Sequence, residues 1–134
     1  MSEFVLHPRL AADTSFVAEW RLSRVLLMND ARYAWLILVP RRPDASELFD
    51  LASSDRAALM EEATRAAQVL KAVSGAAKIY IAALGNLVAQ LHVHVVARNV
   101  GDPAWPGPVW GHNPALPYES AARESLIAKL VNAI

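Results

Sequence analysis

The segment Gln90-Leu91-His92-Val93-His94 holds two of the four histidines of this 134-residue chain, two positions apart. Polar and apolar residues alternate through it with the period of a β-strand, which predicts that Gln90, His92 and His94 lie in a row on one face. Imidazole ionises near neutral pH and can act as a nucleophile, an acid or a hydrogen-bond donor. Phosphoryl transfer needs an attacking atom and donors for the phosphate oxygens, and such a row could supply both.

Two other interpretations of the histidine pair stay open on spacing alone. A histidine on a strand is often a structural residue of the core or of the surface. A His-x-His pair on one strand is also a zinc-ligand geometry, which needs a third ligand. His112 and Asp102 lie downstream, but no fixed spacing ties either of them to the strand. A structural pair, a metal site and a phosphate site therefore remain as alternatives.

Composition limits the class of protein. The chain fits a single domain over residues 1–134, and 54% hydrophobic against 19% charged residues allow a packed core. Thirteen basic and thirteen acidic residues balance, which argues against a sequence-blind nucleic-acid binder because that function needs a basic surface. Cysteine is absent, so disulfides and thiolate chemistry are excluded and a cytoplasmic location is favoured. Residues 1–8 lack a signal-peptide pattern, and no apolar run approaches the ~20 residues of a membrane span.

Four apolar segments predict the strands that must position the histidines. Residues 22–28 and 35–39 are apolar runs separated by turn formers, which is typical of an antiparallel hairpin. Two further strands are predicted over residues 78–84 and 87–96, with Gly85 and Asn86 interrupting them. The second of these would carry the histidine row.

Helices and one long loop complete the predicted order. Residues 53–74 carry an apolar stripe with a period of 3.6 residues, which predicts a helix. Residues 101–117 are rich in proline and are predicted to form a loop, in which Trp105 and Trp110 pack at a dimer contact or in the loop core. A C-terminal helix is predicted over residues 119–134. Hairpin strands with helices set aside predict an α+β domain with a mostly antiparallel sheet.

The histidine segment resembles the signature of the histidine triad (HIT) family, which is a glycine-glutamine pair followed by His-φ-His-φ-His-φ-φ, where φ is apolar. Here the matching residues run from Gly85 to Val96. Residues 35–43 are similar to the family's strand that ends in proline and a basic residue. The resemblance spans roughly residues 24–98, more than half of the chain. It implies a HIT-like fold of about five strands with a main helix and a C-terminal helix, paired as a homodimer.

The resemblance also implies an activity, because HIT proteins are nucleotide hydrolases and transferases. They release a nucleoside monophosphate from a phosphoramidate, a dinucleoside polyphosphate or a similar ester. By position, His92 would be the nucleophile that carries the nucleotidyl group, and His94 would orient it and contact phosphate. Asn86 matches a glutamine whose amide contacts phosphate. No cofactor is implied, and no structural metal, because the family's zinc-binding cysteines are absent.

Several positions depart from the family pattern or stay undecided. Gln90 stands where the first histidine is expected; it keeps an amide donor but loses a cation and an acid. Trp35 replaces the usual histidine before the Leu-Ile-Leu-Val run. Asn29 or Asp30 lies near the family's ribose-binding residue. Arg98 could reach a phosphate or lie on the surface.

Two functions follow as hypotheses: an enzyme, or a nucleotide-binding module that lost catalysis together with the first histidine.

Overall fold

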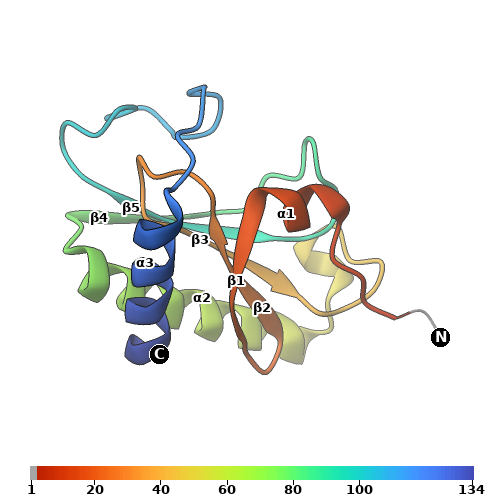
Figure 1. Cartoon of the computed structure of the whole chain (residues 1–134). Helices are drawn as coiled ribbons and strands as arrows, with labels where there is room; N and C mark the ends of the chain where they lie inside the picture. The colour runs from red at the N-terminus through yellow and green to blue at the C-terminus, as the bar shows by residue number, and fades with distance from the viewer. Residues whose placement is uncertain (1–2) are drawn as a thin grey trace.

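A five-stranded antiparallel sheet forms the centre of the computed structural model, which describes residues 3–134 (Figure 1). The strand order is β1-β2-β3-β5-β4. The strands are β1 (Thr14–Glu19), β2 (Ser23–Met28), β3 (Trp35–Pro40), β4 (Lys78–Ala82) and β5 (Val93–Arg98). The prediction of an α+β domain with an antiparallel sheet is confirmed, and β2 and β3 form the predicted hairpin.

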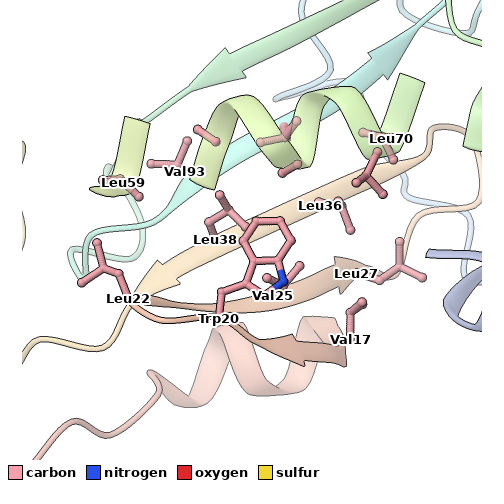
Figure 2. Close-up of a cluster of buried hydrophobic side chains, with 14 of the residues drawn as sticks. Val17, Trp20, Leu22, Val25, Leu27, Leu36, Leu38, Leu59, Leu70 and Val93 are labelled. Carbon is pink, nitrogen blue, oxygen red and sulfur yellow. The ribbon is translucent and has the colours of Figure 1, made fainter. Parts of the chain in front are cut away.

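The central strand β3 is buried at every position, because both faces of the sheet are covered. Its alternate residues serve different layers. Leu36 and Leu38 pack with the long helix α2 (Ser53–Ser74) in the larger core (Figure 2). Trp35 and Ile37 point to the opposite face and join a second apolar cluster. A strand buried on both faces has a continuous apolar sequence, which explains the unbroken run seen here.

The predicted strand over residues 87–96 is wrong in its boundaries. Strand β5 begins only at Val93 and continues to Arg98, paired with β3 on one side and β4 on the other. The preceding residues, 83–92, form an irregular loop. Gly85 adopts a φ of 91°, which turns the chain, and the backbone N–H of Leu91 bonds to the carbonyl of Ala45 instead of a neighbouring strand. The alternation of polar and apolar residues from Gln90 to His92 therefore does not correspond to strand pairing.

The helices agree closely with the predicted ones. Helix α2 ends at Gly75, whose φ of 69° forms the left-handed cap and whose N–H bonds to the carbonyl of Lys71. Ala52 occupies its N-cap. The C-terminal helix α3 (Ser120–Ala133) packs against α2 and β1, and a short helix α1 (Pro8–Asp13) precedes β1. Within residues 3–134, no helix is both long and apolar enough to cross a bilayer. Residues 1 and 2, part of the segment examined for a signal peptide, lie outside the described residues.

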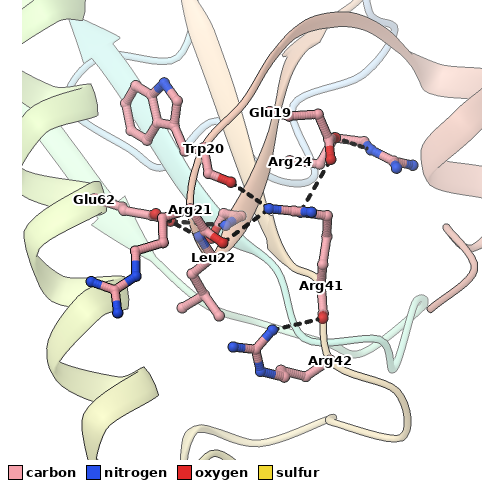
Figure 3. A network of polar contacts seen from close by, with 9 residues as sticks. Glu19, Trp20, Arg21, Leu22, Arg24, Arg41, Arg42 and Glu62 are labelled. Carbon is pink, nitrogen blue, oxygen red and sulfur yellow. Dashed lines mark hydrogen bonds and ion pairs between the residues drawn. The ribbon is translucent and has the colours of Figure 1, made fainter. Parts of the chain in front are cut away.

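One buried carboxylate fastens α2 to the β1–β2 turn. The two carboxylate oxygens of Glu62 accept hydrogen bonds from the backbone N–H groups of Leu22 and Ser23, at 2.9 and 3.0 Å. Arg41 donates to the carbonyl of Trp20 in the same turn (Figure 3). These contacts fix helix α2 against one face of the sheet.

Candidate functional site

A cleft of about 460 Å³ opens on the face of the sheet opposite α2. Its floor is formed by side chains of β3 and β5, and its walls by α1, the 83–92 loop and part of the 101–117 loop. The polar and charged residues that line it are Arg9, Asp13, Asp30, Arg32, Asn86, His92, His94 and Asn113. The predicted histidine pair is therefore brought to a concave surface.

Antiparallel pairing of β3 and β5 positions His94. Ile37 lies opposite His94 and Trp35 lies opposite Val96, so the side chains of Trp35 and His94 share the cleft face. The indole Nε1–H of Trp35 donates a hydrogen bond to Nδ1 of His94, at 3.0 Å. An indole nitrogen is only a donor, so Nδ1 of His94 must be unprotonated and the neutral ring carries its hydrogen on Nε2. The ring of Trp110 packs against the same imidazole, with centroids 5.3 Å apart.

His94 is held in its neutral form. Its side chain is buried, and this burial together with the neighbouring His92 lowers the pKa of His94 from 6.5 to about 3. The two imidazole rings lie 4.8 Å apart between centroids, at 68° to each other. At neutral pH, His94 therefore acts as a hydrogen-bond donor through Nε2 and not as a cation.

His92 has the opposite tautomer. Its Nδ1 lies 2.6 Å from the backbone carbonyl of Gln90, and because a carbonyl only accepts, Nδ1 must carry the hydrogen. In the neutral ring this leaves the lone pair on Nε2. His92 is 7% exposed and lines the cleft. A desolvated imidazole with a fixed Nδ1–H and a free Nε2 is arranged for nucleophilic attack by Nε2.

The expectation that Gln90 shares a row with the histidines is wrong. Its Oε1 accepts from the backbone N–H of His7 and its Nε2 donates to the carbonyl of Val5, both at 2.8 Å. The side chain does not line the cleft; it borders a smaller cavity of about 250 Å³ that also touches His92. Because residues 83–92 form no strand, the side chain of Gln90 is free to turn toward the N-terminal segment.

Asp30, and not Asn29, lines the cleft. Its carboxylate accepts from Nε and Nη2 of Arg32, at 2.9 and 2.8 Å. Burial alone would raise the pKa of Asp30, but the hydrogen bonds from Arg32 and from the backbone N–H of Leu116 outweigh it, so the pKa is lowered and the group is ionised. Asn29 instead accepts a hydrogen bond from the backbone N–H of Tyr118, at 2.9 Å.

Other cleft residues divide into predicted and missed ones. Asn86 lines the cleft, as its match to the phosphate-binding glutamine requires. Arg9, Arg32 and Trp110 line it too and were not predicted. Arg32 had a detectable signal, because an arginine two residues after an aspartate in a turn can pair with it. Arg9 and Trp110 had none, because the packing of distant segments brings them there.

The side chain of Arg98 does not line the cleft and does not lie on the surface, so the structure places it at neither of the two expected positions. Its side chain is fully buried, and Nε and Nη2 donate to the carboxylate of Asp102 at 2.8 and 2.9 Å. The guanidinium also lies over the rings of Tyr80, Trp105 and Tyr33, at 4.7, 5.6 and 5.7 Å. This cluster anchors the beginning of the 101–117 loop, and Trp105 packs within it, which agrees with the loop-core alternative of the prediction.

The metal-site interpretation lacks its third ligand. Across residues 3–134, no group of three histidine, cysteine, aspartate or glutamate side chains is arranged to hold a metal ion. Asp102 is paired with Arg98, and His112 is exposed and does not line the cleft. The pair His92 and His94 therefore has no partner among these candidates.

Fold and site together define an α+β protein in which two buried histidines line a cleft on one face of the antiparallel sheet, His94 from β5 and His92 from the loop before it. Residues 9–101 match the HIT domain, which is more than half of the chain. The protein belongs to the HIT family, and the predicted resemblance is confirmed.

Solved structures show the same relationship. A histidine triad protein of Bradyrhizobium japonicum is 47% identical and superposes with a TM-score of 0.97, covering 99% of each chain. One from Sinorhizobium meliloti 1021 is 46% identical, with a TM-score of 0.96 over 98% of this chain and 97% of that one. A hypothetical histidine triad nucleotide-binding protein of Sulfolobus tokodaii strain7 shares the fold at 16% identity, with a TM-score of 0.69 over 90% and 83% of the two chains. No curated protein matches the chain significantly.

Proposed function

We propose that this protein is a nucleotide phosphohydrolase or nucleotidyl transferase of the HIT type that acts through a covalent intermediate on His92. The observation that carries the proposal is the bond from Nδ1–H of His92 to the carbonyl of Gln90, which leaves the Nε2 lone pair free in a ring that lines the cleft. The substrate is a nucleoside monophosphate joined to a leaving group, as in a phosphoramidate or a dinucleoside polyphosphate.

The residues of the cleft support a two-step reaction. Nε2 of His92 attacks the α-phosphorus, and the bond from phosphorus to the leaving group breaks. The positive charge that develops on the ring is stabilised through Nδ1–H by the Gln90 carbonyl. Nε2–H of His94 and the amide of Asn86 donate to the phosphate oxygens, while the Asp30 carboxylate accepts from the ribose hydroxyls. Water, or an acceptor in a transferase, then takes the nucleotidyl group and restores His92.

The test uses the variant His92→Ala with His112→Ala as its control. Turnover of an AMP phosphoramidate and of diadenosine polyphosphate is expected to fall at least about a thousandfold in His92→Ala, since a missing nucleophile removes a covalent pathway. Intact-protein mass spectrometry of quenched wild type should show a nucleotidyl adduct that is absent from the variant. The control removes an exposed histidine outside the cleft and should keep the adduct. Steady turnover by His92→Ala at the wild-type rate would refute the proposal.

A specific observation favours a second candidate, a nucleotide-binding module without turnover. The side chain at the first triad position, Gln90, is bonded to Val5 and His7 and not to the cleft. Calorimetry with AMP and GMP beside the activity screen separates the two candidates. Binding without turnover, together with activity that appears in Gln90→His, would favour the binding module.

The proposal includes a twofold homodimer. Strand β4 lies at the edge of the sheet, and its Ile81 is 48% exposed. An edge strand offers unpaired backbone groups to a second copy of itself. Light scattering coupled to size exclusion measures the mass of the particle, and a monomer at micromolar concentration would contradict this part of the proposal.

A further inference from the structure

The bond between Trp35 and His94 limits what His94 can do in a reaction. Nδ1 of His94 faces the indole N–H of Trp35 at 3.0 Å. If Nδ1 became protonated, two N–H donors would point at each other, and the hydrogen bond would be lost. Burial of the ring opposes the same protonation. His94 can therefore donate a hydrogen bond through Nε2–H, but it cannot give that proton away, because the product would be an imidazolate.

Among the described residues, the other side chains that line the cleft supply no acid for a leaving group. The Nδ1–H of His92 is bonded to the Gln90 carbonyl. The carboxylate of Asp30 is held by Arg32, and that of Asp13 forms an ion pair with Arg9 at 3.7 Å. The guanidinium groups of these two arginines do not release protons in proteins.

One histidine near the cleft needs a separate test. His112 is exposed and does not line the cleft, although Gly111 and Asn113 on either side of it do. A substrate bound in the cleft could therefore reach it only if this part of the 101–117 loop turned inward. The variant His112→Ala isolates that possibility.

We infer that this site works without a general acid and selects substrates whose leaving group departs as a stable oxygen anion. The inference rests on the proposed function and narrows its substrate class to leaving groups bonded through oxygen, so alkylamine phosphoramidates become poor substrates. Polyphosphates, the carboxylates of acyl nucleotidyl anhydrides and electron-poor phenolates satisfy it, whereas alkyl amines and alkoxides do not. In the step, the bond from Nε2 of His92 to phosphorus forms, the phosphorus–oxygen bond breaks, and the oxygen leaves with both electrons and no proton. Breaking a phosphorus–nitrogen bond in the same way would expel an amide anion, which is a very poor leaving group. The nitrogen must therefore be protonated before that bond breaks, and this requires an acid.

Trp35 is thus a positioning residue, which acts on the reaction through His94. Removing its N–H in Trp35→Phe keeps an aromatic ring at the position but frees Nδ1 of His94. Trp110→Phe is the matched control, because the Trp110 ring packs on the same imidazole while its own Nε1–H has no hydrogen-bond partner among the described residues. Nitrogen-15 spectra of labelled histidine should show Nε2–H for His94 in wild type and in Trp110→Phe, and a mixture of tautomers in Trp35→Phe.

The kinetic test compares three AMP derivatives in wild type: the para-nitrophenyl ester, the phenyl ester and an alkylamine phosphoramidate. The rate of adduct formation on His92 is measured by rapid quench. It should fall at least about a hundredfold from the first ester to the second, because phenolate is the poorer leaving group and no acid compensates for this. A general acid typically supplies about a hundredfold or more. The phosphoramidate should be slower still. Trp35→Phe should narrow these ratios, and Trp110→Phe and His112→Ala should leave them unchanged.

The outcomes separate this inference from the function on which it rests. Equal rates of adduct formation for all three compounds, within about threefold, would overturn the inference and leave the covalent mechanism intact. Ratios that collapse in His112→Ala would also overturn it, because they would identify an acid. Absence of any adduct, with turnover retained in His92→Ala, would overturn the proposed function itself. A His94 ring with its hydrogen on Nδ1 in wild type would remove the structural basis of the inference.

Discussion

Oε1 of Gln90 accepts a hydrogen bond from the backbone N–H of His7, at 2.8 Å, across a sequence separation of 83 residues. Nε2 of the same side chain donates to the carbonyl of Val5. One amide is therefore bonded to two backbone groups of the segment that leads into α1. Helix α1 forms a wall of the cleft through Arg9 and Leu10. The residue that replaces the first histidine of the family signature therefore positions a wall of the cleft instead of lining it.

The variant Gln90→Ala is expected to loosen this wall. Two hydrogen bonds to a half-buried amide are lost, so the free energy of unfolding should fall by about 1–2 kcal/mol. Calorimetric Kd for AMP should rise, and hydrogen exchange at the His7 amide should accelerate. Gln68→Ala, at an exposed position of α2, is the control and should change stability by less than about 0.5 kcal/mol. Unchanged exchange at His7 would contradict the anchoring role of Gln90.

The choice between Asn29 and Asp30 is tested by ribose recognition. If the Asp30 carboxylate accepts the ribose hydroxyls, AMP should bind wild type about tenfold more tightly than its deoxyribose counterpart, since a hydrogen bond to a charged group contributes about 1.5–3 kcal/mol. Asp30→Ala should abolish that preference in calorimetry. Asn29→Ala should retain it, because Asn29 bonds to the backbone of Tyr118 and does not line the cleft. The reverse pattern would assign ribose recognition to Asn29.

Loss of the Glu62 carboxylate should destabilise the fold without touching the cleft. Glu62→Ala leaves the buried N–H groups of Leu22 and Ser23 without partners, which costs about 1–3 kcal/mol for each unsatisfied group (Figure 3). Urea unfolding should show a lower midpoint with an unchanged slope. The neighbouring Glu61→Ala is exposed and should stay within about 0.5 kcal/mol of wild type. Equal midpoints for the two variants would show that the Glu62 bonds contribute nothing.

Most of the fold was predictable because local periodicity coincides with tertiary packing. The apolar stripe of residues 53–74 is the buried side of α2, and Gly75 ends the helix in the conformation that glycine favours. The apolar residues between 87 and 92 have another explanation. There, Val88 and Leu91 are buried because the loop folds back onto the protein, so an apolar segment suggested a strand although no strand pairing occurs.

The site was predictable only where chemistry is carried by adjacent residues. His92, His94 and Asn86 lie in one short segment, and all three line the cleft. The contacts of Arg98 and Trp110 depend on how the 101–117 loop folds back over β5. Nothing in their immediate sequence specifies that path, because loop conformation follows from distant packing.

Acid should weaken the fold through Asp102. The hydrogen bond from Arg98, aided by the backbone N–H groups of Asn99 and Trp105 and opposed by burial, lowers the pKa of Asp102 to about 2. A carboxyl whose pKa is lower in the folded state than in the unfolded chain stabilises the fold. That contribution is fully present when the pH lies above the unfolded-state pKa of about 4, and it is lost as the pH falls toward 2.

The variant Asp102→Asn isolates this contribution from those of the other carboxylates. It leaves the fully buried guanidinium of Arg98 without a counter-charge, so at pH 7 the free energy of unfolding should fall by about 3 kcal/mol. The gap between wild type and variant should then narrow as the pH drops from about 5 to about 2, because the wild-type carboxyl becomes neutral as well. Denaturant unfolding at several pH values measures it, with the exposed Glu124→Gln as control. A difference in the free energy of unfolding that stays constant across that pH range would contradict the prediction. It would show that the charge of the Asp102 carboxylate does not account for the destabilisation in Asp102→Asn.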